Sequence, residues 1–416
     1  MSVQENLRPT YNKKSFQALR AKREVNRISF KKTEANPGDE LDVRVPKLHE
    51  SEVLVPGSLA LVFEIDLSGG HANNFLAQNV TRALVERLQV KFGGTTLQDT
   101  VKYNQYKTFE DPFLSQEERD GMILEGIQSE DLCKIRSGAG DKKTSGVDAE
   151  NALNGVFGSR YRIRLDNQLI TDNGVFYPMA LYNDLEFIIT LAKAKDVVRG
   201  SDSTQLKYKL KNIKLEYEMI HSKTLAEEAV SVYTSGKEFA YDYAQHYTKV
   251  NFKKDTGTFL NIEFNAQIRS LKALLLFIEP HAASARDSEK FIFPNLTKVS
   301  VMVNGSPNML HNNGIKDIDM WREASRMFPK EKNGTDHMDT TKFYTADKFG
   351  LVIDMCSIAD RLLHGSGMRL VNSHSGIQLQ IKRKVKAQAM WSATYSSSPT
   401  PSSTLWTDSW NLWCIE

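Results

Sequence analysis

The sequence contains few cysteines and no long hydrophobic run. Its three cysteines, Cys133, Cys356 and Cys414, are spread along 416 residues, which excludes the paired spacing of a zinc site and the framework of a small disulfide-rich domain. The longest apolar run, at residues 271–278, is far shorter than the roughly 18 residues of a membrane-spanning helix. The amino-terminal residues MSVQENLRPT have no apolar signal core, so we expect synthesis in the cytosol.

The chain also has little excess charge, with a formal net charge of +3 at pH 7. With 40% hydrophobic and 25% charged residues, its composition is typical of a globular protein and unlike that of a disordered or membrane-embedded chain. A length of 416 residues favours two domains of roughly 200 residues each.

Positive charge is nevertheless concentrated at the amino terminus, where residues 1–36 contain nine Lys or Arg against three Glu. We interpret this segment as a basic arm. Runs of charge are more often merely solvated, and contact of the arm with phosphates of a genome or with an internal anionic membrane is the alternative. The spacing of Phe16, Leu19 and Ala21 also fits a short surface helix. The candidate basic residues are Lys13, Lys14, Arg20, Lys22, Arg23, Arg27, Lys31 and Lys32.

Alternation of apolar and polar residues with a period of two dominates both halves of the sequence. In residues 59–67 (LALVFEIDL) one face carries Leu59, Leu61, Phe63, Ile65 and Leu67, while Glu64 and Asp66 lie on the other. Such clean alternation indicates antiparallel sheets with one solvated face, because strands of parallel sheets are buried on both faces. The same pattern recurs at residues 160–165, 212–219, 259–264, 298–303 and 376–381.

Helical signals are few and short. They occur at residues 102–113, 115–127, 222–233 and 315–328, and long polar loops at 136–155 and 328–341 separate the strands. Two of the predicted helices carry aromatic residues, namely Tyr103, Tyr106, Phe109 and Phe113 in the first and Trp321 and Phe328 in the last.

The order of these features repeats along the chain. Residues 79–82 (NVTR) resemble residues 295–298 (NLTK), 216 positions later, and each block is followed by a strand, a glycine, a leucine and an aromatic helix. We interpret this order as a structural duplication with a hinge near residues 221–228. Two copies with about eight short antiparallel strands each predict two tandem jelly rolls, and a single large β-sandwich or two unlike sandwiches are the alternatives.

Several strings of the sequence resemble double jelly-roll major capsid proteins (hexons) of the Polinton (Maverick) and adintovirus type. In the first half these are YPMALYNDLEFIITLAKAKDVV and YKLKNIKLEYEMI, at residues 177–198 and 208–220. In the second half they are residues 299–328 and 363–381, and the resemblance covers roughly residues 40–385. It implies an all-β protein of two tandem eight-stranded antiparallel jelly rolls with short inserted helices, spanning residues 37–222 and 223–416 after the 1–36 arm.

What the resemblance implies for function is a structural protein of the virion, made in the host cytoplasm. Three chains would form a homotrimer whose six barrels make a pseudo-hexameric capsomer, and capsomers would tile an icosahedral shell with penton and minor capsid proteins. We expect no enzyme activity and no cofactor. The aromatic helices around Tyr103–Phe113 and Trp321–Phe328 are the candidate inter-subunit contacts, although half or more of their aromatic rings are expected to fill their own barrels.

The carboxyl-terminal residues depart from the family pattern. After residues 380–385 (QIKRKV) a closing strand is expected, but residues 386–416 lack alternation, are rich in Ser, Thr and Pro, and contain four of the five tryptophans. We treat this tail as atypical, and a reading-frame shift near Lys386 is one hypothesis for it.

Two other function classes are compatible with tandem jelly rolls: a cupin-like or glycan-active enzyme, and a carbohydrate-binding protein. An enzyme would need clustered His and Glu ligands or paired carboxylates at inward-facing positions, where the alternating strands place aliphatic and aromatic residues. The histidines, among them His311, lie scattered in polar contexts, and acidic residues such as Asp319 are expected on solvated helix surfaces. The sequence therefore predicts no catalytic, cofactor or metal site.

Overall fold

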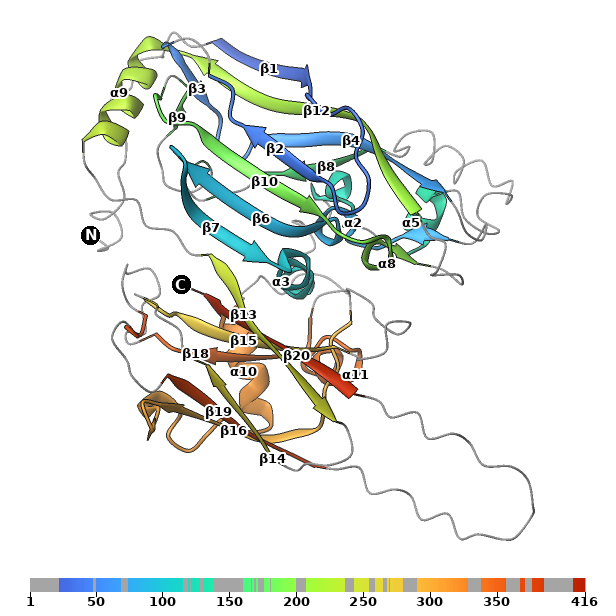
Figure 1. Ribbon diagram of the computed structural model, residues 1–416, viewed down its shortest axis with the longest axis vertical. Helices are drawn as coiled ribbons and strands as arrows, with labels where there is room; N and C mark the ends of the chain where they lie inside the picture. The colour runs from blue at the N-terminus through green and yellow to red at the C-terminus, as the bar shows by residue number, and fades with distance from the viewer. Residues whose placement is uncertain are drawn as a thin grey trace. The chain divides into compact units, whose positions relative to one another are not determined.

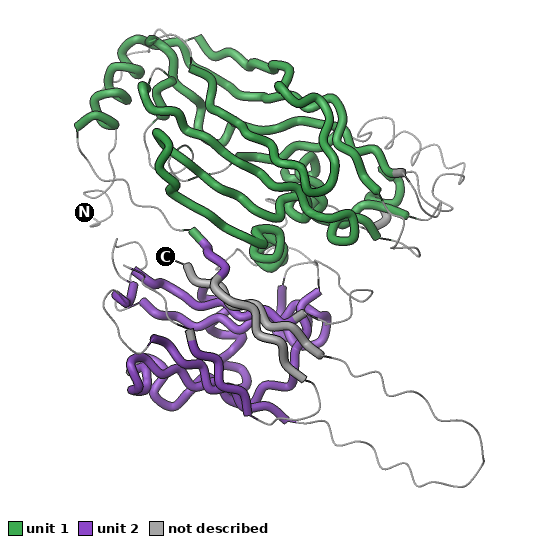
Figure 2. Tube along the Cα trace, viewed as in Figure 1, with its two compact units in different colours: residues 1–243, 331–337, 362–364 green, residues 244–330, 338–361, 365–416 purple. Residues whose placement is uncertain are grey.

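A computed structural model describes two compact units, which Figure 2 distinguishes by colour. The first comprises residues 1–243, 331–337 and 362–364, and the second comprises residues 244–330, 338–361 and 365–416. For residues 130–131, 247–253, 264, 279, 309 and 407–415 only the backbone is described. The described residues are 22–47, 50–68, 74–114, 119, 121–127, 130–137, 160–165, 167, 170, 176–179, 181–199, 207–235, 243–253, 259–264, 268, 270–279, 290–327, 338–356, 367–370, 376–384 and 407–415.

The first unit contains two larger antiparallel sheets and a short two-stranded one (Figure 1). One sheet has the order β8-β4-β12-β3-β9, with β1 also paired to β12, and the other has the order β2-β10-β6-β7. The strands of the first sheet are β1 Lys22–Ser29, β3 Glu52–Leu54, β4 Ala60–Ser68, β8 Arg160–Arg164, β9 Tyr177–Pro178 and β12 Lys207–His221. Those of the second are β2 Glu40–Arg44, β6 Val85–Phe92, β7 Thr95–Val101 and β10 Leu185–Leu191, while β5 Phe75–Leu76 pairs with β11 Val198–Arg199.

The second unit contains two antiparallel sheets of four strands, in the orders β13-β20-β15-β18 and β14-β19-β16-β17. The strands of the first are β13 Ala244–Lys253, β15 Ala273–Glu279, β18 Gly350–Asp354 and β20 Thr407–Ile415. Those of the second are β14 Phe259–Phe264, β16 Leu296–Val303, β17 Ser306–Pro307 and β19 Ile377–Arg383.

Helices are short and lie between the strands. Among the described residues, the α-helices are α2 Val80–Ala83, α3 Tyr103–Glu110, α5 Glu130–Ser137, α8 Ala194–Val197, α9 Lys223–Thr234, α10 Ile318–Met327 and α11 Thr340–Thr345. The 3₁₀ turns in the same residues are η1 Asp111–Phe113, η2 Ile123–Glu125 and η5 Met309–His311. Within the described part of the chain, no helix is both long and apolar enough to cross a membrane.

Eight strands of the first unit correspond to the eight strands described in the second unit, and they neighbour one another in the same order within the sheets. The order β1-β12-β4-β8 corresponds to β13-β20-β15-β18, and β2-β10-β6-β7 corresponds to β14-β19-β16-β17. In both units the strand that is last in the sequence, β12 or β20, lies between the first and the third strand of this set. This arrangement is a jelly roll, so the predicted fold class of two tandem antiparallel jelly rolls is confirmed.

The equivalence of β6 and β16 extends to single residues. Both strands have the same sequence of buried and half-buried positions, and both contain an irregularity one residue from their start, where Glu86 and Thr297 are skipped in the pairing to β10 and β19. These positions are 211 apart, so the alignment of residues 79–82 with 295–298 is wrong. Asn79 precedes helix α2, whereas Asn295 precedes strand β16.

Burial follows the predicted alternation. Leu59, Leu61, Phe63 and Ile65 are buried in the core of the first jelly roll, whereas Glu64 is exposed on the other face of β4. In β19, Ile377, Leu379 and Ile381 are likewise buried. Each such aliphatic or aromatic side chain contributes roughly 1.5–3 kcal/mol by leaving water, and this term dominates the stability of each sheet pair.

The structure corrects the expected limits of the first jelly roll at both ends. Residues 22–29, assigned to a separate basic arm, form β1 and pair along their whole length with β12. The expected hinge at 221–228 falls in the end of β12 and in α9, where Leu225, Ala226 and Ala229 pack against Val53 of β3. The first jelly roll therefore begins earlier and ends later than residues 37–222.

The atypical tail also takes part in the fold. Residues 407–415 form β20, which pairs with β13 on one side and with β15 on the other. The tail of this sequence therefore supplies a strand at the position where the closing strand of the second jelly roll is expected. Residues 386–406 lie outside the described residues.

Candidate functional site

The aromatic residues of the first candidate helix serve mainly the first jelly roll itself. Phe109 in α3 and Phe113 in η1 are buried, with ring centroids 5.4 Å apart. Tyr103 is half-buried and packs against the core cluster. Tyr106 is half-buried, and the Nζ atom of Lys107 lies 5.2 Å from its ring centroid. Phe109 and Phe113 are therefore inaccessible to another subunit, and the two tyrosines keep partly exposed surface.

The second candidate helix, α10, presents two different faces. Met320 and Ala324 are fully buried, and the half-buried Trp321 packs on Phe343 of α11 with ring centroids 5.3 Å apart. Ile318 at the start of the helix is 58% exposed. The face with Ile318 is available to a partner, and the face with Met320 is not. Phe328 lies outside the described residues.

Most of the described basic residues near the amino terminus form ion pairs within the first jelly roll. The Nε atoms of Arg23 and Arg27 donate to Glu218 and Glu216 of β12 over 2.7 and 2.8 Å. Lys22 pairs with Glu24 at 3.1 Å, Lys32 pairs with Asp39 at 2.8 Å, and Lys31 is exposed. These pairs show that β1 is a charged strand of the sheet. Lys13, Lys14 and Arg20 lie outside the described residues.

Asp39 illustrates how these charges are held. Its carboxylate accepts a hydrogen bond from the backbone N–H of Asn36 at 2.8 Å and pairs with Lys32. Both interactions favour the ionised form, so they hold the pKa of Asp39 below its ordinary value, with the backbone hydrogen bond as the larger cause. The turn that leads from β1 to β2 is thereby stabilised at neutral pH.

A second polar cluster lies between α2 and α3 in the first jelly roll and is largely buried. The Nδ2 atom of Asn79 donates to Thr108 at 2.7 Å, and the Arg82 Nε atom lies 3.7 Å from the Asp111 carboxylate. Burial raises the pKa of Asp111 because it disfavours the charged form, and Arg82 opposes this effect. The cluster connects α2 to α3, so we assign it a role in stability.

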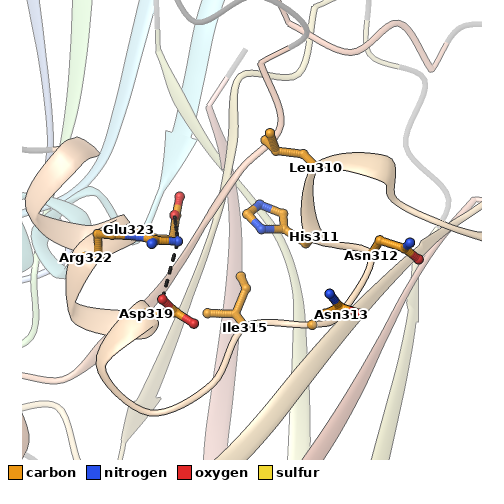
Figure 3. Close-up of a pocket in the computed structure, with 9 residues that line it drawn as sticks. Leu310, His311, Asn312, Asn313, Ile315, Asp319, Arg322 and Glu323 are labelled. Atoms are coloured by element: carbon orange, nitrogen blue, oxygen red, sulfur yellow. Dashed lines mark ion pairs between the residues drawn. The ribbon is translucent and has the colours of Figure 1, made fainter.

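A small pocket opens in the second jelly roll between η5 and α10 (Figure 3). Its volume is about 210 Å³, and its walls come from residues 310–315 on one side and from Asp319, Arg322 and Glu323 of α10 on the other. The His311 Nε2 atom lies 3.0 Å from the backbone carbonyl oxygen of Asp354, which fixes the imidazole at the wall of the pocket. The rim residue Leu310 is 55% exposed.

Glu323 is the most buried charged residue of this pocket, at 2% exposure. Its Oε1 atom lies 3.6 Å from Arg322 and 3.5 Å from Arg326. Its Oε2 atom is buried and has no hydrogen-bond partner among the described residues. A buried carboxylate oxygen without a donor is unfavourable by about 1–3 kcal/mol, so this atom can accept a further hydrogen bond.

Sequence reasoning missed this pocket. Asp319 was expected on a solvated helix surface and His311 in an open loop, but both line the pocket. Glu323 falls four residues after Asp319 on the same helical face, which is a signal for a shared environment. The signal does not reveal burial, because burial depends on the packing of α10 against β18.

The described residues do not form a metal centre. Among the described residues, no group of three or more His, Cys, Asp or Glu side chains is placed to hold a metal ion. Cys133 is buried, with its Sγ atom 3.6 Å from the backbone oxygen of Ala77, and Cys356 is half-buried, with its Sγ atom 3.5 Å from the backbone oxygen of Lys272.

Comparison with solved structures identifies proteins of similar fold. The Sputnik virophage structure matches with a TM-score of 0.55 and 10% identity over 97% of this chain and 88% of that chain. The Faustovirus major capsid protein matches with a TM-score of 0.51 and 8% identity over 98% and 92% of the two chains. This chain has the double jelly-roll fold of viral major capsid proteins.

The PBCV-1 virus capsid also matches this double jelly roll, with a TM-score of 0.50 and 10% identity over 97% of this chain and 95% of that chain. Identity of 8–10% means that the likeness lies in the order and packing of strands. In sequence, no model of a protein family and no curated protein matches the chain.

Proposed function

We propose that this protein is a major capsid protein whose homotrimers form pseudo-hexameric capsomers of an icosahedral viral shell. The observation that supports this proposal best is the match of nearly the whole chain, both jelly rolls in order, to double jelly-roll viral capsid proteins. Two similar barrels per chain allow three chains to present six similar flanks, and closed symmetry then uses each contact repeatedly.

The proposed partners are other copies of the chain, first within the trimer and then in neighbouring capsomers, together with penton and minor capsid proteins. The Polinton and adintovirus type rests on the sequence strings described above. The proposed location is the virion capsid, after synthesis in the host cytoplasm. Contact with a genome or an internal membrane would involve Lys13, Lys14, Arg20 and Lys31, because Arg23 and Arg27 are engaged by Glu218 and Glu216.

Exposed apolar side chains indicate where subunits would meet. Tyr182, in the turn before β10, is 94% exposed, and tyrosine is enriched at the centre of protein interfaces. Phe259 in β14 and Ile318 in α10 are exposed by 48% and 58%. We propose that these three side chains contribute to contacts between copies.

Size-exclusion chromatography with light scattering tests the proposal. We expect a stable species with three times the chain mass of 47.1 kDa, and negative-stain microscopy should show particles of pseudo-hexagonal outline. A protein that stays monomeric at all concentrations would contradict the proposal. Tyr182→Ser should reduce the trimer fraction, whereas the matched exposed substitution Val101→Ser should leave it unchanged if Tyr182 is an anchor.

A further inference from the structure

His221, at the end of β12, lies between two carboxylates that come from different strands. Its Nδ1 atom lies 3.0 Å from the Oε1 atom of Glu52 in β3, and its Nε2 atom lies 3.3 Å from the Oε2 atom of Glu24 in β1. In the backbone register, His221 pairs with Glu52 on one edge of β12 and with Lys22 on the other (Figure 1). One imidazole ring therefore connects β1, β12 and β3.

The protonation state of the ring decides how many of these contacts are hydrogen bonds. An ionised carboxylate only accepts hydrogen bonds, and a protonated imidazole carries an N–H at each nitrogen, so the protonated ring can donate to both glutamates. A neutral ring carries one N–H, and the lone pair of its other nitrogen then faces a carboxylate oxygen. Histidine is the side chain whose charge ordinarily changes between pH 5 and 8, so the number of bonds changes in this range.

The contact with Glu24 is the one that a neutral ring gives up. Glu52 is closer, and its side chain is 10% exposed against 38% for Glu24, so loss of the donor is more unfavourable at Glu52. Glu24 also has a second donor, because the Nζ atom of Lys22 lies 3.1 Å from the same Oε2 atom. The neutral ring then donates from Nδ1 to Glu52, and its Nε2 lone pair repels the Glu24 carboxylate. This repulsion acts on β1 and not on β3.

Strand β1 depends on polar contacts of this kind. Within the described part of the chain it pairs with β12 alone, and its apolar side chains Val25 and Ile28 are 58% and 44% exposed. Because β1 buries little apolar surface, it belongs to the least stable parts of the sheet, where local opening is frequent. The gain or loss of one charged hydrogen bond can therefore alter how often β1 opens.

The other titratable groups around the ring keep their charge in this range. Lys22, and more weakly His221, hold the pKa of Glu24 below its ordinary value, so this carboxylate stays ionised. Burial raises the pKa of Tyr217 in β12 and of Tyr177 in β9, so both phenols stay neutral. The remaining charged neighbours along β1, β12, α9 and the turn before β3 are Arg23, which pairs with Glu218, Lys223, which pairs with Glu227, and the exposed Glu50.

We propose that His221 is a proton-dependent latch that holds strand β1 in the first jelly roll. The protonated ring bonds to both glutamates and ties β1 to β12 and β3. As the pH rises and the ring loses its proton, repulsion replaces the bond to Glu24 and β1 opens more often. The contribution of the latch is thus present in weak acid and lost toward alkaline pH, opposite to that of a carboxylate with a lowered pKa. The latch is independent of assembly, because all of its contacts lie within one copy of the chain.

Hydrogen exchange of the full chain, followed by mass spectrometry, tests the latch. Exchange in peptides that cover β1, residues 22–29, is measured at about pH 5.5 and about pH 8, on either side of the ordinary histidine range. Each rate is divided by the intrinsic exchange rate at the same pH. We expect the protection of β1 to be about fivefold lower at the higher pH, the effect of one partly exposed ion pair. Protection of β6, residues 85–92, should not change.

Two variants separate the latch from other effects of pH. His221→Gln and Glu24→Gln should each abolish the pH difference in β1, because each variant lacks one member of the ring–carboxylate pair. Glu227→Gln, which removes an exposed acid from α9, is the control and should retain the difference. The latch is excluded if the parent chain protects β1 equally at both pH values, if β6 changes as much as β1, or if either variant keeps the parent's difference. Circular dichroism verifies that each variant is folded, and either variant alone suffices for the decision.

Discussion

Gly94 and Gly305 occupy the same position in equivalent hairpins of the two jelly rolls. Their φ angles are +81° and +78°, and the residues before them, Gly93 and Asn304, also have positive φ angles of +56° and +51°. Each pair forms the two-residue connection between paired strands, Phe92 to Thr95 and Val303 to Ser306. Two successive positive φ angles match the right-handed twist of such hairpins and favour Gly or Asn.

Gly94→Ala and Gly305→Ala should each destabilise the protein by about 1 kcal/mol, because a side chain at positive φ is strained. Apart from the chain neighbours, no atom of the described residues lies within 4 Å of a Cβ added at either position, so the cost is conformational. Urea denaturation measures the change in free energy of unfolding. Gly305→Asn serves as the control and should cost less, since Asn tolerates this conformation. Alanine variants as stable as the parent would contradict the equivalence of the two turns.

Phe343→Ala should destabilise the second jelly roll by about 3–5 kcal/mol, the usual effect of emptying a large aromatic site. Phe343 is fully buried, and its ring contacts Trp321, Tyr344 and Phe349 with centroids 5.0–5.3 Å apart. Leu310→Ala, at a 55% exposed site, is the control and should change stability by about 0.5 kcal/mol or less. Similar losses in both variants, measured by chemical denaturation, would refute this assignment of the core.

Replacing Arg23 and Arg27 together by Gln should lower the free energy of unfolding by about 1 kcal/mol at low salt. Both arginines pair with glutamates of β12 and are 66% and 44% exposed, so solvent screens each pair. The difference from the parent protein should shrink toward zero at ~1 M salt, where the screening length is only about 3 Å. Lys31→Gln is the control for loss of positive charge alone. If the stability of the double variant depended on salt in the same way as that of Lys31→Gln, the ion pairs between β1 and β12 would not contribute to stability.

Asp99→Asn should remove a stability contribution of about 1 kcal/mol that is present at neutral pH. The Arg87 guanidinium donates to both Asp99 oxygens, at 2.8 and 2.7 Å, and this interaction holds the pKa of Asp99 below its ordinary value. For a carboxyl group with a lowered folded-state pKa, the contribution is complete above the unfolded pKa, about 3.9, and is lost as the pH falls through the lowered value. Parent and variant should therefore differ in unfolding free energy at pH 7 and converge in strong acid. A difference in unfolding free energy that does not change with pH would exclude the ion pair as its cause.

A chain that ends after residue 406 should fail to form a stable second jelly roll. Strand β20 lies between β13 and β15, and its loss would leave the facing backbone groups of both strands without partners. We expect loss of most of the cooperative unfolding signal of that unit and increased aggregation. Removal of Glu416 alone is the control and should have no effect. A truncated chain that unfolds like the full one would show that β20 is dispensable.

Local sequence pattern was sufficient for the strands that have one buried face. The alternation in residues 59–67 and 376–381 predicted β4 and β19, and the Asn304-Gly305 pair predicted a break where a tight hairpin occurs. These features depend on neighbours within a few residues, so periodicity and turn chemistry reveal them directly. The aromatic helices were also located correctly, although the residue types alone did not show that Phe109 of α3 is buried.

Strand partners and buried charge were decided only in three dimensions. β1 lacks an alternating apolar face, since its place at the sheet edge leaves Val25 and Ile28 exposed and its arginines are neutralised by glutamates about 190 positions away. β20 has no clear strand pattern, yet it closes the second jelly roll between two strands that need a backbone partner. Glu323 lies buried in a helix that packs against β18, a strand that follows it by about 30 positions. Periodicity reports which face of a segment avoids water, whereas the identity of the neighbour depends on the packing of the whole chain.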